Sequence, residues 1–237
     1  MTLPSFPNVD LFSAGINALN GVMVARNPSH NRGYAVVGLL IMGFFGGIGG
    51  GVSRDVLLND VPSPFKDPTY FIVCLSMGFL GLGIYRYADS MEERFRTRML
   101  AYFKSFTLPW FAVLGAHKAL SHDLGIFAAI LIGLIATTAG GVLIDLFSNV
   151  TPDIVRPSEH LVTTAVLASS IYATVAVQMQ TRVEFFPLTL VAVLTAFLFR
   201  VVAVREHWAQ IVPLAGLAAG ARARPEAPPL KKVSGSN

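Results

Sequence analysis

The chain has 237 residues, of which 53% are hydrophobic and only 14% are charged, and its mean hydropathy is +0.59. Soluble domains carry about 25% charged residues, so this composition excludes an ordinary soluble enzyme and requires apolar side chains that face lipid. The net charge of +4 follows no pattern typical of nucleic-acid binding, and the single cysteine, Cys74, excludes an intrachain disulfide and a cysteine-based metal site.

Seven apolar stretches follow one another along the chain. Each has the length of a transmembrane helix, which needs about 20 apolar residues. We therefore predict an all-α membrane protein with seven transmembrane helices and no separate soluble domain. Residues 1–9 contain no Lys or Arg and no cleavage site follows, so the first stretch is predicted to remain as a helix. The stretches are 10–25, 34–58, 69–87, 100–120, 124–148, 158–178 and 184–204.

Lys and Arg residues are distributed unevenly between the two predicted sides of the membrane. Fourteen of the 18 follow the first, third, fifth or seventh stretch, three lie on the other side, and Arg54 lies within a stretch. Cytoplasmic loops carry the excess of basic residues. This predicts a multi-pass protein of the cell (inner) membrane with residues 1–9 outside, a cytoplasmic connector at 86–104 and a disordered cytoplasmic tail at 206–237.

An internal repeat becomes visible when the chain is shifted by 90 residues against itself. Segment 43–66 then aligns with segment 133–156 without a gap. Six of the matched pairs are identical Gly, Pro or polar residues: Gly43 with Gly133, Gly50 with Gly140, Gly51 with Gly141, Asp55 with Asp145, Asn59 with Asn149, and Pro62 with Pro152. Each copy lies in a unit of three spans, so residues 10–85 and 105–180 are predicted to form an inverted 3+3 repeat, with one additional helix at 181–205.

The glycines of the repeat allow two interpretations. Gly43, Gly47 and Gly51 are spaced four apart, which is typical of close helix packing. Three consecutive glycines, Gly49, Gly50 and Gly51, also weaken a helix by about 1 kcal/mol each relative to Ala, which predicts a break or kink. A break in the second and fifth helices would line a pathway with backbone carbonyls, which bind monovalent cations weakly.

Arg54, Asp55 and Asp145 are charges inside predicted spans, where charge is costly and usually functional. Adjacent residues point about 100° apart on a helix, which disfavours a direct contact between Arg54 and Asp55. The repeat equivalent of Arg54 is Ile144, so the second acid has no neighbouring cation. The two hypotheses are that Arg54 and Asp145 form a structural ion pair, and that these acids line a pore.

Lys118 stands near the end of the fourth stretch, where a lysine ordinarily extends towards the membrane surface. No metal-ligand spacing and no catalytic set of side chains is present, so neither a metal site nor an enzyme is predicted. The candidate ion pathway or kink consists of Gly49, Gly50, Gly51, Ser53, Asp55, Thr137, Thr138, Gly140, Gly141 and Asp145, and the candidate structural or gating charges are Arg54 and Lys118.

The motifs GGIGGGVSRDVLLNDVPSPF, AGGVLIDLFSNVTP and FAVLGAHKAL together resemble the prokaryotic branch of the trimeric intracellular cation (TRIC) channel family, over about residues 10–205. They are also similar to bacterial inner-membrane proteins with a GGGxxRDxLL signature, labelled as a glycine-transporter domain. The resemblance implies seven helices, a homotrimer, a potassium-permeable pore in each protomer, kinked glycine motifs at Gly49–Gly51 and Gly140–Gly141, and a gating role for Lys118.

Three functions are compatible with these features. The first is a monovalent-cation channel for K⁺ or Na⁺ without a cofactor, surrounded by membrane lipids and without a nucleic-acid partner. The second is a secondary transporter of a small zwitterion such as glycine, in which helix N-termini and Arg54 bind a carboxylate. The third is a structural membrane protein without a permeation path.

Overall fold

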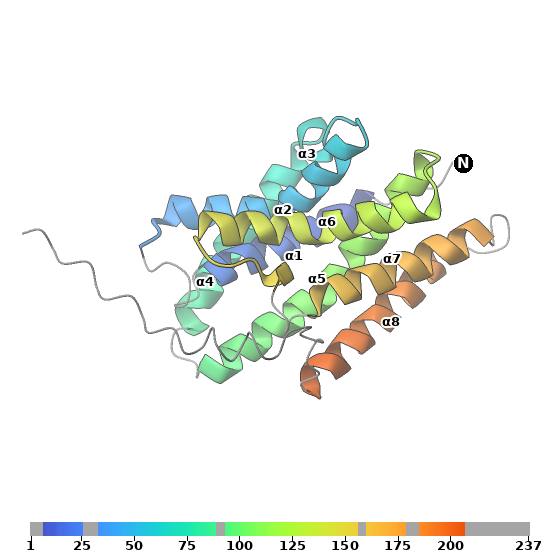
Figure 1. Ribbon diagram of the computed structural model, residues 1–237. Coiled ribbons are helices and arrows are strands. Elements are labelled where there is room, and N and C mark those ends of the chain that lie inside the picture. Colours follow the sequence, from blue (N-terminus) through green and yellow to red (C-terminus); the bar gives the residue numbers. More distant parts are fainter. Residues whose placement is uncertain (1–6, 26–32, 89–92, 156–159, 179–184, 207–237) are drawn as a thin grey trace, which may run out of the picture.

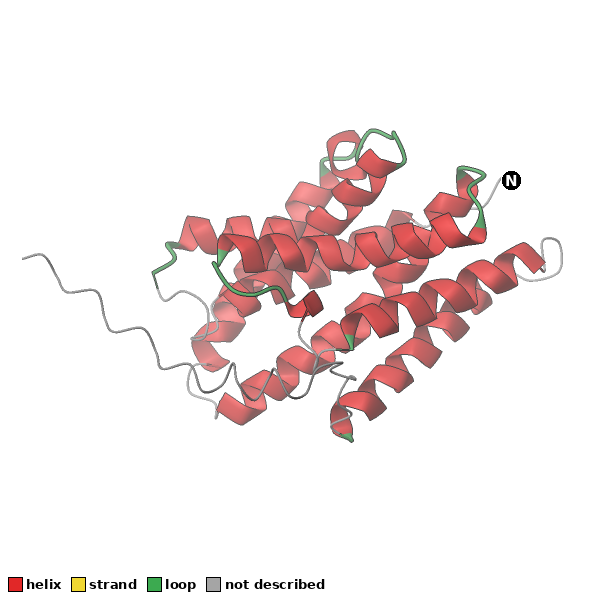
Figure 2. Ribbon diagram, in the orientation of Figure 1, coloured by secondary structure: helices red, strands yellow, loops and turns green. Residues whose placement is uncertain are grey.

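The computed structural model describes residues 7–25, 33–88, 93–155, 160–178 and 185–206. All regular structure in these ranges is helical (Figures 1 and 2). The elements are α1 (Pro7–Ala25), α2 (Val36–Leu57), α3 (Ser63–Lys66), α4 (Thr69–Ala88), α5 (Glu93–Ser121), α6 (Ile126–Phe147), a 3₁₀ turn η1 (Asp153–Val155), α7 (Leu161–Gln178) and α8 (Phe185–Arg205). Residues 1–6 of the predicted external segment and 207–237 of the predicted tail lie outside the described residues.

Seven of these helices have between 18 and 29 residues. In the described ranges, α2, α6, α7 and α8 are long and apolar enough to cross a membrane, and α4 contains a shorter apolar stretch, Thr69–Ile84. α1 is more polar because it contains Asn17 and Asn20, and α5 begins inside the charged connector at Glu93. The prediction of an all-helical membrane protein is confirmed, whereas seven crossings remain a prediction.

The helices pack in the same way in the two halves of the chain. α1 packs against α2 and α4, and α2 contacts α4; α5 packs against α6 and α7, and α6 contacts α7. The halves meet mainly where α2 lies along α6, in the middle of the bundle in Figure 1, and α8 covers α5 and α7. Alanines fill much of the core between α5, α6, α7 and α8, because small side chains allow helices to approach closely.

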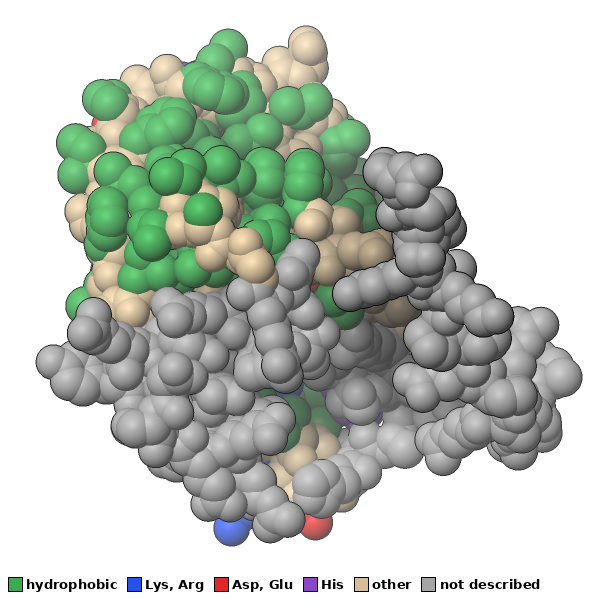
Figure 3. Space-filling view, turned by 90° about the vertical axis from the view of Figure 1, so that its left-hand side faces the viewer, with side chains coloured by type: hydrophobic (Ala, Val, Ile, Leu, Met, Phe, Trp, Pro, Cys, Tyr) green, Lys and Arg blue, Asp and Glu red, His purple; other side chains and the backbone are tan. Residues whose placement is uncertain are grey.

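The outer face of the bundle is strongly apolar. Figure 3 shows one such face, on which hydrophobic side chains predominate. Large apolar side chains are exposed on α4, α6 and α8, among them Ile72, Phe79, Phe127, Leu194 and Leu198. An apolar surface of this extent is unfavourable in water, and it is what a lipid bilayer requires of the helices that it surrounds.

α2 and α6 end in the same local structure. Asn59 and Asn149 follow the two helices and both have a φ of 54°, a left-handed conformation that asparagine tolerates better than most residues. In both copies the N–H of the next residue donates to the carbonyl of the aspartate in the last turn, Asp55 or Asp145, at 2.9 Å. This is a Schellman motif, and the left-handed conformation that it requires explains why the asparagine recurs at a spacing of 90 residues.

The glycine-rich segments do not interrupt the helices. α2 is continuous from Val36 to Leu57 and α6 from Ile126 to Phe147. The predicted break is therefore absent from α2 and α6, whereas the predicted kink at the glycines stays a prediction. The helices remain intact because the absence of side chains at the glycines lets the backbones of α2 and α6 contact each other directly.

Candidate functional site

A cluster of charged and polar side chains occupies one end of the bundle. α1 and α4 begin there, and α2 and α5 end there, because consecutive long helices run in opposite directions. The charged cluster consists of Asp10 (α1), Arg54 and Asp55 (α2), Asp60 (the α2–α3 loop), Ser63 and Lys66 (α3), Tyr70 (α4) and Lys118 (α5).

Arg54 is almost completely buried and is held by two carboxylates. Its Nε donates to Asp55 Oδ1 at 2.7 Å, and its two terminal nitrogens each lie 3.3 Å from a carboxylate oxygen of Asp10. The Tyr70 hydroxyl donates to Asp10 Oδ2 at 2.9 Å. The hypothesis that Arg54 pairs with Asp145 is therefore wrong. The expectation that a direct contact between Arg54 and Asp55 is disfavoured also fails, because the long arginine side chain folds back to reach Asp55.

Asp55 is fully buried and accepts hydrogen bonds on both carboxylate oxygens. Oδ1 accepts from Arg54 and from Lys118 Nζ at 2.8 Å, and Oδ2 accepts from the Ser63 N–H at 2.8 Å and the Ser63 hydroxyl at 2.9 Å. Hydrogen bonds from cations to a carboxylate are roughly twice as strong as neutral ones. These bonds fix the carboxylate as an anion and give it a structural role.

Lys118 bridges two acids. Its Nζ lies 2.8 Å from Asp55 Oδ1 and 2.9 Å from Asp60 Oδ2, and its expected orientation towards the membrane surface stays a prediction. Lys66 Nζ lies 2.8 Å from the other oxygen of Asp60. Hydrogen bonds from Lys66 and Lys118 hold the pKa of the Asp60 carboxyl well below its usual range.

The charged cluster joins the two halves of the chain. In the described ranges it contains three carboxylates and three basic side chains, so its formal charges balance. From the second half, Lys118 contributes ion pairs, and His122 Nε2 lies 4.0 Å from Asp60. A cavity of about 10 Å³, room for about one water, lies beside the cluster; its lining includes Asp10, Gly47, Gly51, Arg54, Tyr70 and Phe111. We call it the outer cavity.

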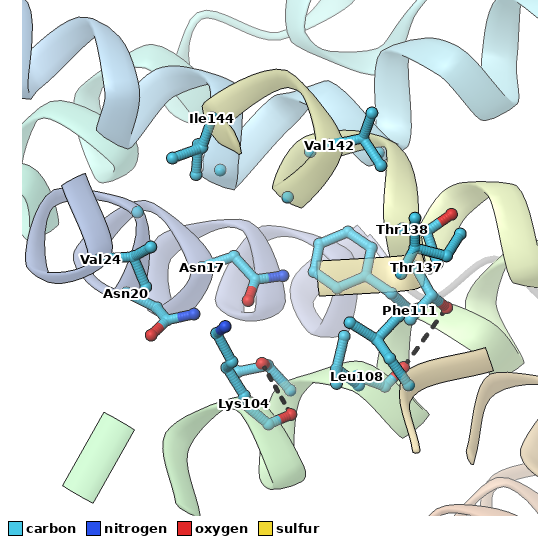
Figure 4. Close-up of a pocket in the computed structure, with 18 of the residues that line it drawn as sticks. Asn17, Asn20, Val24, Lys104, Leu108, Phe111, Thr137, Thr138, Val142 and Ile144 are labelled. Carbon is cyan, nitrogen blue, oxygen red and sulfur yellow. Dashed lines mark hydrogen bonds between the residues drawn. The ribbon is translucent and has the colours of Figure 1, made fainter. Parts of the chain in front are cut away.

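A larger cavity of about 60 Å³, the inner cavity, lies between α1, α2, α5 and α6 (Figure 4). At roughly 10–15 Å³ for each water, it has room for several waters. Figure 4 shows the side chains of Asn17 and Asn20 from α1 and of Lys104 from α5 converging on this space. Thr137, Thr138, Gly140, Gly141 and Asp145 complete much of the polar side of its wall.

Oxygen atoms dominate the polar groups that α1 and α6 bring to the inner cavity. The hydroxyls of Thr137 and Thr138 donate to the carbonyls one turn earlier, at 2.7 and 2.9 Å, which leaves their oxygens available as acceptors. Asn20 Oδ1 is buried and has no hydrogen-bond partner within the described residues. A buried acceptor of this kind requires water or a cation.

The glycines fall into two groups with different surroundings. A Cβ at Gly50 would overlap the carbonyl oxygen of Ala136, and one at Gly140 would lie 2.8 Å from the Phe45 carbonyl oxygen. At Gly51 and Gly141, by contrast, a Cβ would meet almost nothing: only an Arg54 nitrogen at 3.9 Å in the first case and nothing within 4 Å in the second. One glycine of each copy is therefore required for the crossing of α2 and α6, and the next faces a cavity.

A family model described as "Glycine transporter" matches residues 8–86 and residues 101–177. Together these ranges make up more than half of the chain. The chain belongs to this glycine transporter family. Each matched range contains one copy of the 90-residue repeat, so the family model supports the duplication that the residues indicate.

Relatives of this chain within and beyond the glycine transporter family are membrane proteins. The inner membrane protein YadS of Escherichia coli (strain K12) is 25% identical over 200 residues, which cover 84% of this chain and 91% of YadS. Among solved structures, the TRIC trimeric intracellular cation channel orthologue from Rhodobacter sphaeroides is similar, with a TM-score of 0.72, 26% identity and coverage of 85% of this chain and 97% of that one.

A prokaryotic TRIC channel crystallised in 0.5 M KCl gives a TM-score of 0.73 at 23% identity, with 84% of this chain and 95% of that chain covered. The resemblance to the prokaryotic TRIC family is therefore confirmed. The chain is a multi-pass membrane protein whose structural neighbours are ion channels rather than enzymes.

The predicted site residues fall into two regions of the structure, the charged cluster and the cavities. Asp55, Arg54 and Lys118 belong to the charged cluster, while Thr137, Thr138, Gly140, Gly141 and Asp145 line the inner cavity. Gly50 lines the inner cavity and Gly51 lines the outer one. Gly49 packs on the Cα of Gly140 instead. Neither Gly49 nor Ser53 lines these two cavities. Within the described ranges no group of three or more His, Cys, Asp or Glu residues could hold a metal.

Sequence reasoning missed Asp10, Asn17, Asn20, Ser63 and Tyr70. A signal for the two asparagines and Asp10 existed: they are polar residues inside or at the start of an apolar stretch. Ser63 and Tyr70 carry no such signal, because a serine after a loop and a tyrosine at a helix start are ordinary residues at those places.

The duplicated aspartates have different surroundings because the repeat changed around them. At the positions equivalent to Arg54 and Ser63, whose side chains donate to Asp55, the second copy has Ile144 and Asp153. The second copy therefore lacks the arginine and serine side-chain donors that surround Asp55. Asp145 lies instead in the wall of the inner cavity.

Proposed function

We propose that this protein is a monovalent-cation channel, permeable to K⁺, with a pathway inside each protomer of a homotrimer. The observation that carries the proposal is the inner cavity, which lies between α1, α2, α5 and α6 and whose wall, although largely apolar, includes Asp145 and threonine and asparagine side chains. Such oxygens can replace the hydration shell of a weakly bound cation. The solved structures of similar fold support it, since those proteins are described as TRIC channels.

The proposed pathway runs from the charged cluster, past the crossing of α2 and α6, to the inner cavity. The two cavities lie on the two sides of the glycine segment: Gly47 and Gly51 line the outer one, and Gly46 and Gly50 line the inner one. The pathway has no cofactor, and K⁺ or Na⁺ is the permeant species. The protein's partners are membrane lipids and two further copies of the chain.

The proposed topology has seven crossings with an inverted repeat, an external N-terminus and a cytoplasmic C-terminus. The equal packing of α1, α2 and α4 and of α5, α6 and α7 supports the repeat. Equivalent helices of the two copies are three crossings apart. Because this number is odd, one copy is inverted relative to the other. Lys118 is the proposed gating charge, because it connects the end of α5 to Asp55 and Asp60 by ion pairs alone.

Recording in a planar lipid bilayer tests the proposal. The purified protein is expected to give unitary currents in symmetrical KCl, and a KCl gradient should move the reversal potential towards the potassium equilibrium value. Absence of unitary currents in the intact protein, or a reversal potential at the chloride value, would contradict the proposal.

The alternative is a secondary transporter of a small zwitterion such as glycine, which the description of the family favours. In that mechanism Arg54 would bind the substrate carboxylate, but its guanidinium already contacts the carboxylates of Asp10 and Asp55. Uptake of labelled glycine into proteoliposomes separates the functions: a transporter gives saturable uptake without unitary currents.

A further inference from the structure

Phe111 is the residue at which the two cavities meet. It lies on α5, is 2% exposed, and contributes to the walls of both the outer and the inner cavity. In Figure 4 its ring lies between Asn17 on α1 and Thr137 on α6, at the edge of the inner cavity. A large apolar ring therefore lies between the two cavities, each of which also has polar residues in its wall.

Three side chains of α5 that border a cavity or belong to the charged cluster are spaced seven residues apart. Lys104 borders the inner cavity, Phe111 lies between the cavities, and Lys118 belongs to the charged cluster. Seven residues are close to two helical turns, so the three side chains share one face of α5 and span about 21 Å along it. A single movement of α5 would displace all three together.

Glycines of α2 contribute to the walls of both cavities. Gly46 and Gly50 line the inner cavity, and Gly47 and Gly51 line the outer one, so α2 contributes backbone to both walls. An apolar constriction between wet spaces blocks ions because water leaves it. The ring of Phe111, which lines both cavities, has the chemistry of such a constriction.

We propose that Phe111 is the occluding residue of the pathway: its ring separates the outer from the inner cavity, and its displacement joins them. This inference rests on the proposed channel function. Pro109 lies two residues before Phe111 and is fully buried. A proline inside a helix removes one backbone hydrogen bond, here the one to the Ser105 carbonyl, so α5 can bend next to the ring.

Access of Ag⁺ to a cysteine in the inner cavity tests the separation without recording a current. Ag⁺ is a monovalent cation that binds thiolates. The background variant is Cys74→Ala, and Gly141→Cys places the thiol where a Cβ meets nothing within 4 Å. Right-side-out and inverted vesicles are exposed to Ag⁺, and the thiols left unmodified are then counted by labelling after solubilisation.

With Phe111 intact, Ag⁺ is expected to reach Cys at 141 at least about tenfold faster from one side of the membrane, because a dewetted constriction excludes ions. Phe111→Leu should retain this difference, Phe111→Val should reduce it, and Phe111→Ala should bring the two rates close together. Because the series is graded, Phe111→Val still tests the inference if Phe111→Ala does not fold. Cys74→Ala without the second cysteine corrects for background.

Equal rates from both sides in the intact protein, or an unchanged difference in Phe111→Val and Phe111→Ala, would overturn the role of Phe111. Bilayer recordings of the same variants separate this failure from failure of the channel. If the graded access is found but no variant conducts K⁺, the occlusion stands and the channel function falls. If wild-type protein conducts and Phe111→Ala neither changes access nor raises the open probability, the channel function stands and the occluding role of Phe111 falls.

Discussion

The Nζ of Lys118 lies 2.8 Å from Oδ1 of Asp55, and this contact ties the end of α5 to the end of α2. The same nitrogen lies 2.9 Å from Asp60. The second half of the protein is therefore attached to the charged cluster through a side chain whose loss would leave two carboxylates short of one cation.

Lys118→Met should lower the free energy of unfolding by about 1–3 kcal/mol. Removing one partner of a fully buried pair costs about 3–5 kcal/mol, and the partial exposure of Lys118, 21% of its side chain, reduces the loss. Lys66→Met is the control: its side chain is 51% exposed, and exposed pairs contribute about 0–1 kcal/mol. Thermal unfolding in detergent measures both, and equal losses would contradict the structural role of Lys118.

Neighbouring glycines should respond differently to alanine. Gly50→Ala places a Cβ on the Ala136 carbonyl and should cost about 1–3 kcal/mol or more. Gly51→Ala has space for the new methyl group and should be neutral or stabilising by up to about 1 kcal/mol, because Ala favours helix.

The second copy provides an independent test of the same distinction, in which Gly140→Ala is expected to destabilise and Gly141→Ala to be tolerated. Melting temperatures in detergent decide between them. Equal tolerance of all four substitutions would mean that α2 and α6 can move apart without cost.

Asp55→Asn and Asp145→Asn should have separate effects. The first substitution leaves Arg54 and Lys118 with one charged partner fewer and should cost about 3–5 kcal/mol of stability. The second removes a carboxylate from the wall of the inner cavity and should lower the permeability ratio of K⁺ to Cl⁻. Thermal unfolding combined with reversal potentials distinguishes the two, and greater instability of Asp145→Asn would contradict this assignment.

Asp60 should stabilise the protein over the whole physiological pH range. Hydrogen bonds from Lys66 and Lys118 depress its pKa in the folded state. A depressed carboxyl contributes stability above its unfolded pKa, about 3.9, and loses it as the pH falls towards the folded pKa. The difference in melting temperature between wild type and Asp60→Asn is therefore expected to be constant from about pH 8 to 5 and to shrink below about pH 4. A change between about pH 7 and 6 would contradict the assignment of this stability to Asp60.

The helices, the internal duplication and the family could be predicted because they depend on periodic, local properties. Apolar stretches of span length recur, and Asn59 and Asn149 repeat because each adopts the left-handed conformation that ends its helix. The packing role of glycines spaced four apart was also visible. The consecutive glycines misled because their cost was assigned to a helix break, whereas contact between α2 and α6 compensates for it.

The pairing of charges could not be predicted because it depends on where helix ends meet. Asp10 is 44 residues from Arg54, and Lys118 is 63 residues from Asp55. Sequence spacing carries no information about such contacts, and the repeat suggested the wrong partner. Likewise, no pattern along α5 identifies Phe111 until the two cavities on its sides are known.

The balanced charges of the cluster have a consequence for electrical attraction at this mouth of the protein. While Lys118 is in place, three acids and three bases compensate one another, so an approaching ion meets little net field. If Lys118 left the cluster, as the proposed gating role requires, the remaining groups would carry one net negative charge, which would draw in cations. Preference for cations at this end would then be a property of one conformation, and rectification would change with the state of α5 rather than with the composition of the bath.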